Sequence, residues 1–162
     1  MLTCRMCKKN NLSQFLDLGF TPPADQFLRK EQLNEPEVYY PLRVMACVDC
    51  GLIQLSHVVS PEVLYRHDYP YESSITRTGH IHWNEFAKST TERFGLSARD
   101  LVIDIGSNVG VLLDAFKANG TRVLGVDPAS NIVRIAEKRG IETICEFFSM
   151  DVAHQILQEK GN

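Results

Sequence analysis

The sequence lacks a long apolar run and an excess of positive charge. No window approaches the roughly 20 apolar residues that span a bilayer, and no apolar signal segment follows Met1. Lys and Arg number 17 against 20 Asp and Glu, so no positive field attracts phosphate backbones or anionic lipids. Neither nucleic acid nor a membrane is expected as a partner. These absences predict a cytoplasmic protein, in a compartment where thiols stay reduced.

Cysteine is scarce, yet four of the five cysteines form two Cys-x-x-Cys pairs. Cys4 pairs with Cys7 and Cys47 with Cys50, and the 39 residues between the pairs exceed the 15 to 20 of the compact spacing. In a reducing compartment such pairs indicate metal ligation or redox chemistry before disulfides. Four thiolates suit tetrahedral Zn²⁺ and leave no open position for catalysis. The sequence therefore predicts a structural zinc site.

Other interpretations of the cysteines stay open. Two disulfides or incidental thiols are less favoured, and neither pair begins a helix after a strand, as a redox motif would. A nucleic-acid zinc ribbon is disfavoured because residues 1–50 carry six basic and six acidic side chains. Cys145 stands alone among apolar neighbours, which predicts a small buried side chain.

Three zones differ in their residue patterns: 1–56, 57–97 and 98–162. The first is turn-rich, with short apolar runs, and predicts short strands and loops in a zinc-binding module. The second is a linker and lid segment whose apolar spacing predicts a helix from about Ile75 to Phe94. The third alternates strands (101–105, 122–126, 142–147) with helices (109–118, 129–139, 150–160), the last capped by Ser149.

This alternation predicts the fold class, which is α/β with a parallel sheet and right-handed crossovers. Doubly wound nucleotide-binding sheets have roughly six strands in the dinucleotide-binding form, and three are expected here. We therefore expect a zinc-binding N-terminal module followed by the first half of a Rossmann-like domain, truncated at Asn162.

A glycine-containing loop follows the first strand of the third zone, where open α/β sheets bind ligands. Gly106 permits close backbone approach, and Gly110 lets the next helix pack near the strand or the ligand. Asn108 stands where the fingerprint G-x-G-x-x-G has its second glycine, so an NAD site is disfavoured. Asp104 places a carboxylate at the strand end, which suits an ammonium or hydroxyl group better than a diphosphate.

Asp127 follows the second strand, 23 residues after Asp104. A ribose-binding acid lies at about this separation from the glycine loop, which favours a role on ribose hydroxyls. The alternative is an N-cap, with Pro128 at the first helical position, and both roles can hold together. Residues at the end of the third strand are candidates to contact an adenine, or are ordinary core aromatics with a cap: Phe147, Phe148 and Ser149.

The motifs taken in order resemble the nucleotide-sugar C-methyltransferase family over essentially all 162 residues. These S-adenosylmethionine-dependent enzymes carry an N-terminal zinc-binding domain, a Rossmann-like domain and a further C-terminal domain. The motifs are the two Cys-x-x-Cys pairs, Leu16-Asp17-Leu18-Gly19, Thr21-Pro22, Tyr40-Pro41-Leu42, Tyr69-Pro70-Tyr71-Glu72-Ser73-Ser74, Asp-x-Gly-Ser-Asn-x-Gly and Gly-Val-Asp-Pro.

The resemblance implies a zinc ion and a cofactor site. Zinc would bind Cys4, Cys7, Cys47 and Cys50. S-adenosylmethionine would bind Asp104, Gly106, Ser107, Asn108, Gly110 and Asp127. The resemblance also implies a lid that meets cofactor and sugar through Tyr71, Ser73 and Ser74, although these residues could instead form an aromatic packing strip with serine caps. Val109 departs from the family, which often has an acidic residue at that position.

The implied reaction is methylation of a keto-sugar nucleotide at the carbon next to the ketone. The family's candidate base lies in later parts that this chain lacks, and His80 and His82 are better interpreted as packed or surface histidines. We therefore assign no catalytic residue, leave the oligomeric state open, and expect the 162-residue fragment to be poorly active. The alternatives are a non-catalytic zinc-containing interaction module with a vestigial nucleotide-binding fold and, less favoured, a nicotinamide-dependent oxidoreductase.

Overall fold

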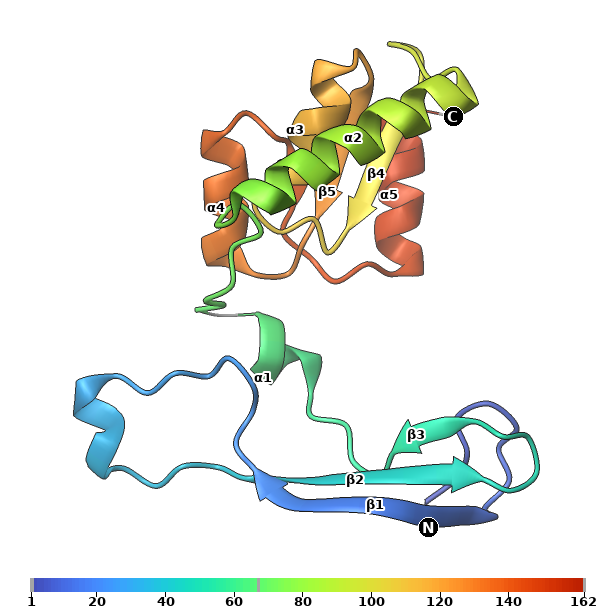
Figure 1. Ribbon diagram of the computed structural model, residues 1–162, viewed down its shortest axis with the longest axis vertical. Coiled ribbons are helices and arrows are strands. Elements are labelled where there is room, and N and C mark those ends of the chain that lie inside the picture. Colours follow the sequence, from blue (N-terminus) through green and yellow to red (C-terminus); the bar gives the residue numbers. More distant parts are fainter. Residues whose placement is uncertain (1, 67, 162) are drawn as a thin grey trace. The chain divides into compact units, whose positions relative to one another are not determined.

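The chain divides into two compact units, Met1–Leu64 (unit 1) and Tyr65–Asn162 (unit 2). The computed structural model describes residues 2–66 and 68–161 (Figure 1). Within those residues no helix is both long and apolar enough to cross a membrane.

Unit 1 is built on a three-stranded antiparallel sheet. Its strands are β1 (Leu12–Thr21), β2 (Tyr40–Cys47) and β3 (Ile53–Leu55), in the order β1-β2-β3. The 3-10 helix η1 (Lys30–Asn34) lies in the long connection between β1 and β2, and the short helix α1 (Pro61–Tyr65) follows the sheet (Figure 1).

The first strand is longer than the short strands predicted for this zone. It extends over 10 residues because two register shifts, between Gln14 and Leu16 and between Asp17 and Phe20, let it follow β2. At the second shift Gly19 has a φ of 75°, and its N–H donates to Asp17 Oδ1 at 2.9 Å. Such bulges bend a strand while preserving its pairing on either side.

Unit 1 buries almost no apolar side chain. Among its described residues only Cys4, Cys47 and Gln54 are buried, whereas large apolar side chains such as Phe27 and Leu33 are exposed. A unit of this size without an apolar core is marginal unless a metal or another cross-link adds folding free energy.

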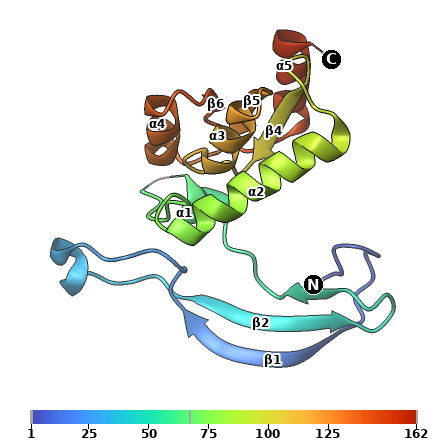
Figure 2. The same ribbon diagram turned by 45° about the horizontal axis from the view of Figure 1, so that its top comes forward.

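Unit 2 contains a parallel sheet with helices on both faces, which confirms the predicted α/β fold class. The strands are β4 (Leu101–Ile105), β5 (Arg122–Val126) and β6 (Thr143–Ile144), in the order β4-β5-β6 (Figure 2). The helices are α2 (Arg77–Phe94), α3 (Val111–Ala118), α4 (Ser130–Lys138) and α5 (Met150–Lys160). Ser149 caps α5 as predicted, because its side chain accepts from the Val152 N–H at 3.3 Å.

Side chains alternate between the two faces of this sheet. Val102 and Val123 pack against α3 and its neighbours α2 and α4, and α2 and α3 lie in front of the strands in Figure 1. Leu124 and Val126 pack on the other face against Val152 and Ile156 of α5. The positions that follow the strands at their carboxyl ends are thereby fixed by a well-packed core.

The third strand is shorter than the predicted range 142–147. It pairs with β5 only through Gly125 with Thr143 and Val126 with Ile144. The chain then turns, because the Glu146 N–H donates back to the Ile144 carbonyl at 3.0 Å. Cys145 follows the last paired residue and is exposed, so its predicted burial is wrong.

Candidate functional site

The two Cys-x-x-Cys pairs fold into the same turn. Cys4 N–H donates to Lys9 O at 2.7 Å, and Lys8 N–H donates to Cys4 O at 3.0 Å. The second pair repeats both bonds, from Cys47 N–H to Leu52 O at 2.8 Å and from Gly51 N–H to Cys47 O at 2.9 Å. The residue after each second cysteine has a left-handed φ, 64° at Lys8 and 76° at Gly51. The two turns thus present two thiols each in the same way.

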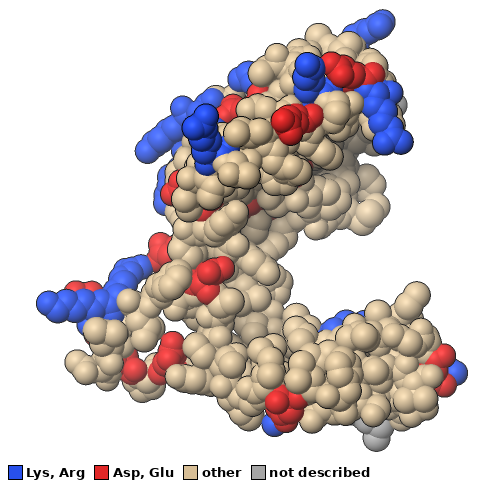
Figure 3. Space-filling model, viewed as in Figure 1, with Lys and Arg blue, Asp and Glu red and all other residues tan. Residues whose placement is uncertain are grey.

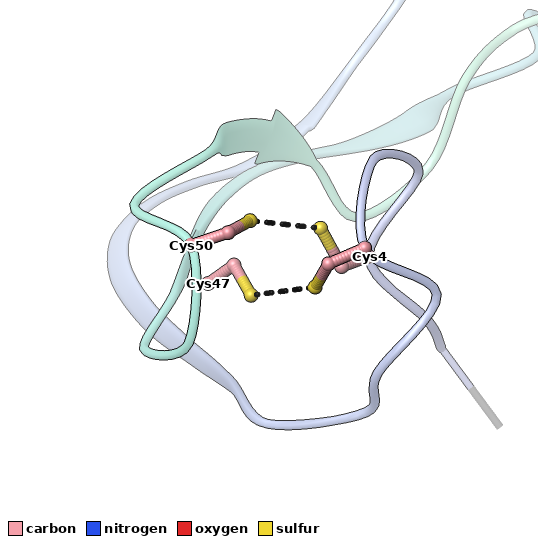
Figure 4. Close-up of side chains that lie close together, drawn as sticks. Cys4, Cys47 and Cys50 are labelled. Carbon is pink, nitrogen blue, oxygen red and sulfur yellow. Dashed lines mark hydrogen bonds between the residues drawn. The ribbon is translucent and has the colours of Figure 1, made fainter.

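The four predicted metal ligands converge (Figure 4). Their sulfur atoms all lie within 4.8 Å of one another, and the pairs Cys4–Cys50 and Cys7–Cys47 are 3.6 Å apart. A tetrahedron with Zn–S bonds of about 2.3 Å has edges of about 3.8 Å, so the separations fit a four-sulfur zinc shell. All five cysteines are free thiols, which fits metal ligation and not disulfides.

The crowded thiols cannot all ionise without a cation. A backbone hydrogen bond at Cys7 is the main cause that lowers the pKa of Cys4 to about 6. For Cys50 the backbone hydrogen bond at Leu52 lowers the pKa, but desolvation and hydrogen bonds with the other three thiols outweigh it and raise the pKa to about 12. Cys4 is therefore the thiol of this pair that ionises first. A bound divalent cation favours thiolate at every ligand.

Three polar contacts outside the cluster hold the turns together. Gln54 of β3 is 5% exposed; its Oε1 accepts from Arg5 N–H at 2.9 Å, and its Nε2 donates to Thr3 O at 3.2 Å. Lys9 Nζ lies 3.0 Å from Asp49 Oδ1 across the two turns. Sequence reasoning missed Gln54, because Ile53-Gln54-Leu55 predicts apolar residues inside and the structure buries the glutamine instead.

The loop after β4 leaves no backbone amide free for a ligand between residues 106 and 110. The Gly106 and Ser107 N–H groups donate to Val126 O, at 2.8 and 3.3 Å. The Asn108 N–H donates to Asp127 Oδ2 at 2.9 Å. The Val109 N–H donates to Asn108 Oδ1 at 2.9 Å, and the Gly110 N–H to Ser107 O at 3.0 Å. A phosphate-binding loop needs such groups pointing at the anion, so this loop is unsuited to a diphosphate.

The predicted loop residues have different surroundings. Gly106 has a φ of 78°, and a Cβ built there would meet no atom within 4 Å, so the backbone is open to a ligand. Gly110 is closed, because a Cβ would lie 3.0 Å from the Ile141 side chain. Ser107 is buried with its hydroxyl turned toward Gly125, and that Oγ is one of two buried polar side-chain atoms without a partner in the described chain. Val109 is fully buried in a cluster with Ala129 and Ile132.

Two carboxylates meet at the carboxyl ends of β4 and β5. Burial and then the charge of Asp127 raise the pKa of Asp104. Asp127 is 7% exposed, and its Oδ1 accepts from Ala129 N–H at 2.9 Å. This Asx turn replaces the predicted cap at the start of α4, since Ala129 is the N-cap residue and Pro128 precedes it. Each carboxylate oxygen has two lone pairs, so Asp127 retains acceptor capacity beyond its two amide bonds.

The segment with the predicted lid residues lies against the glycine loop within unit 2. Asn108 Nδ2 donates to Tyr71 O at 2.9 Å, and Asn108 Oδ1 accepts from Ser73 N–H at 2.8 Å. The Tyr71 side chain is 54% exposed. His80 Nε2 donates to Ser74 O at 3.0 Å, and the His82 ring contacts Trp83 edge-on, so both histidines have structural partners.

The candidate adenine-contacting residues follow β6. Phe147 is half-buried, with the Arg66 guanidinium carbon 5.0 Å from its ring centroid, and Phe148 is 45% exposed. Arg66 also pairs with Glu146 at 3.2 Å. Ser149 uses its hydroxyl as the cap of α5. The sequence predicted the Ser149 cap but not the contacts of Arg66 with Phe147 and Glu146.

Two comparisons with known proteins give matches, one to the N-terminal part of the chain and one to nearly all of it. Residues 4–65 match a family described as "Putative zinc binding domain". These residues include all four ligands of the cysteine cluster.

Over 158 residues the chain is 37% identical to the C-methyltransferase NovU of Streptomyces niveus. The match covers 98% of this chain and 37% of NovU, so the chain spans little more than a third of the length of that relative. The two matches confirm the family resemblance predicted from the sequence.

Proposed function

We propose that this chain contributes the metal module and the cofactor crevice of an S-adenosylmethionine-dependent C-methyltransferase. The proposed substrate is a keto-sugar nucleotide, methylated at the carbon next to the ketone. The relative named above is a C-methyltransferase, which supports the reaction class. Reduced thiols at the cysteine cluster fit the proposed cytoplasmic location.

The observation that carries the proposal is the polarity of the carboxyl ends of β4 and β5 and of the loop between residues 106 and 110. All five loop amides from 106 to 110 are used within the protein, whereas Asp104 and Asp127 offer carboxylate oxygens. Such a site rejects a diphosphate and favours a ligand with an ammonium group and hydroxyls. S-adenosylmethionine has both, and when bound it supplies an electrophilic methyl group.

The proposed contacts follow from this placement. Asp127 would accept from the ribose hydroxyls and Asp104 from the ammonium, with the ligand against Gly106. Phe147, Phe148 and Ser149 would border the adenine. Ser107 and Asn108 would contribute backbone atoms other than their bonded N–H groups, because their side chains face Gly125 and the segment of Tyr71.

The substrate side is proposed at Tyr71, Ser73 and Ser74. A ketone acidifies the neighbouring C–H bond, a base removes that proton, and the carbon then takes up the methyl group, so positioning and enolate stabilisation carry the rate. Among the described residues the nearby His80 is bonded to Ser74 O, and no base is assigned. We propose that the 162-residue chain by itself has little turnover.

The proposal is tested by calorimetry with S-adenosylhomocysteine on the full 162-residue chain. The unmodified chain should bind, and Asp127→Asn should weaken binding by about tenfold or more, since hydrogen bonds to a charged group are worth roughly 1.5 to 3 kcal/mol. Asp127→Ala should bind still more weakly. Asp114→Asn is the matched control, because this acid of α3 pairs with Arg139 and not with the crevice residues.

A folded chain that gives no heat would contradict the methyltransferase proposal and favour a non-catalytic interaction module. Trp83, the single tryptophan, is half-buried in unit 2 and reports whether each variant is folded.

A further inference from the structure

Residues 68–73, here called the strap, are bound to two different elements of the sheet's carboxyl edge. Asn131 of α4 accepts from Tyr69 N–H at its Oδ1 (3.2 Å) and donates from its Nδ2 to Tyr69 O (2.8 Å). Asn108 makes the equivalent pair of bonds with Tyr71 O and Ser73 N–H, at 2.9 and 2.8 Å. Each carboxamide therefore uses both its donor and its acceptor on strap backbone, as a neighbouring strand would.

The attachment points follow the order of the strands. Asn131 lies after β5 and Asn108 after β4, so the strap passes from the carboxyl end of one strand to that of the next. Just before the strap, Arg66 contacts Glu146 and Phe147 after β6. The main-chain path over this edge is thus fixed by side chains that belong to the packed half of unit 2.

We propose that Asn108 and Asn131 are positioning residues that hold the strap as a fixed wall of the cofactor crevice. This inference rests on the proposed function. Tyr71 and Ser73 are then in place before any ligand arrives, so ligand binding does not have to order this segment. Ordering a free segment of six residues on binding would cost backbone entropy and weaken the affinity.

A substitution at Asn131 can test how the strap is positioned without removing a residue that is proposed to contact the cofactor. Both polar atoms of its side chain are occupied by Tyr69, and the residue was not among the predicted cofactor contacts. Removing this carboxamide should release the strap while leaving the carboxylates and Gly106 unchanged. Alanine is also a good helix former, so Asn131→Ala should preserve α4.

The test compares three variants of the full chain. Asn131→Ala removes both bonds, and Asn131→Asp keeps the acceptor for Tyr69 N–H but loses the donor. Asn119→Ala is the matched control, because Asn119 Nδ2 donates to Ala115 O at 2.8 Å at the end of α3. Measurements are amide hydrogen exchange at Tyr69 and Ser73, calorimetric affinity for S-adenosylhomocysteine, and the Trp83 unfolding midpoint.

Asn131→Ala should speed exchange at Tyr69 and Ser73 and weaken binding about fivefold, the worth of roughly one net hydrogen bond. Asn131→Asp should be intermediate on both readouts, and Asn119→Ala should change only the unfolding midpoint. Unchanged exchange in Asn131→Ala, or equal affinity losses in Asn131→Ala and Asn119→Ala at a temperature where both are folded, would overturn the proposal.

The two proposals fail in different ways. If the unmodified chain does not bind the probe, the proposed function is wrong and the role of the strap in binding is wrong with it. Exchange at Tyr69 and Ser73 still decides separately whether Asn131 holds the strap.

Discussion

The two units of the chain contain comparable apolar side chains but place them differently. In unit 2 they lie between helices and sheet, as with Leu113, Leu124 and Ile132, each no more than 1% exposed. In unit 1 they remain on the surface, as with Leu18 at 57% exposed, and the view in Figure 3 shows few charged side chains over its sheet. Unit 2 thus has its own hydrophobic core, whereas unit 1 depends on its cysteine cluster.

Removing the metal should give the largest effect and separate the two units. Zinc binding to four thiolates is worth about 10 to 16 kcal/mol in small zinc modules, more than the stability of a typical domain. Chelation, or Cys47→Ser, should therefore abolish amide protection across residues 2–64. Protection within residues 68–161 should persist, since the core of unit 2 contains no metal ligand.

The same cysteine-to-serine change at Cys145 is the matched control, because this thiol is exposed and lies outside the cluster. Elemental analysis should find one zinc per chain in the unmodified protein and in Cys145→Ser. Retained protection in residues 2–64 after complete metal removal would show that unit 1 folds without the ion.

Truncating one leucine in each unit should show the same difference between the units, with a smaller loss of stability than metal removal. Leu124→Ala in β5 should cost about 2 to 5 kcal/mol of the free energy of unfolding of unit 2, because it leaves a cavity in the core. Leu18→Ala in β1 should change the free energy of unfolding of unit 1 by about 0.5 kcal/mol or less, as substitutions of exposed residues usually do. Denaturant titrations measure both losses. Trp83 fluorescence follows the unfolding of Leu124→Ala, and hydrogen exchange follows that of Leu18→Ala. A large loss from Leu18→Ala would mean that unit 1 has an apolar core after all.

The ionised Asp104 carboxylate should lower the stability of unit 2, although we propose that it binds the cofactor. Burial and the charge of Asp127 raise the pKa of Asp104 above its ordinary 3.8. The fold is therefore most stable with Asp104 protonated. This contribution to stability is fully present below pH 3.8 and is lost as the pH rises through the raised pKa of the folded state. Asp104→Asn should thus raise the Trp83 unfolding midpoint at pH 7, with a gain that disappears below pH 3.8, yet weaken S-adenosylhomocysteine binding about tenfold.

Asp100 provides a control of opposite sign beyond the other end of β4. Hydrogen bonds from the Ser97 hydroxyl and backbone lower its pKa, so its ionised form stabilises the fold. Asp100→Asn should lower the unfolding midpoint at pH 7 and leave binding unchanged. If Asp104→Asn and Asp100→Asn changed the affinity equally, Asp104 would have no specific role in binding the cofactor.

Sequence patterns predicted the features that depend on the spacing of residues along the chain. They missed the features that depend on contacts between residues far apart in the sequence. The cysteine pairs, the helices around the parallel sheet and the Ser149 cap follow from short-range periodicity and residue type. The length of β1 depends on bulges, and the early end of β6 depends on one backbone bond at Glu146. Gln54 and Asn131 act through backbone partners 49 to 62 residues away, which no local pattern reveals.

The smallest predicted effect concerns the symmetry of the two metal-binding turns. Lys8 and Gly51 occupy equivalent positions with left-handed φ values, and a side chain at such a position costs about 1 to 2 kcal/mol. Lys8→Gly relieves this strain but adds unfolded-state entropy and removes the bond from Lys8 Nζ to Arg5 O. The expected net gain is about 0.5 kcal/mol or less, whereas Gly51→Ala should lose about 1 kcal/mol.

Competition between the protein and a chelator for Co²⁺, followed by thiolate-to-metal absorption, measures both changes on one scale. The opposite signs are the essential point, because the two turns share the same pair of backbone hydrogen bonds and differ in the residue at the left-handed position. If Gly51→Ala binds Co²⁺ as well as the unmodified chain, a side chain at this left-handed position has no cost for metal binding, and the proposed difference between the two turns is wrong.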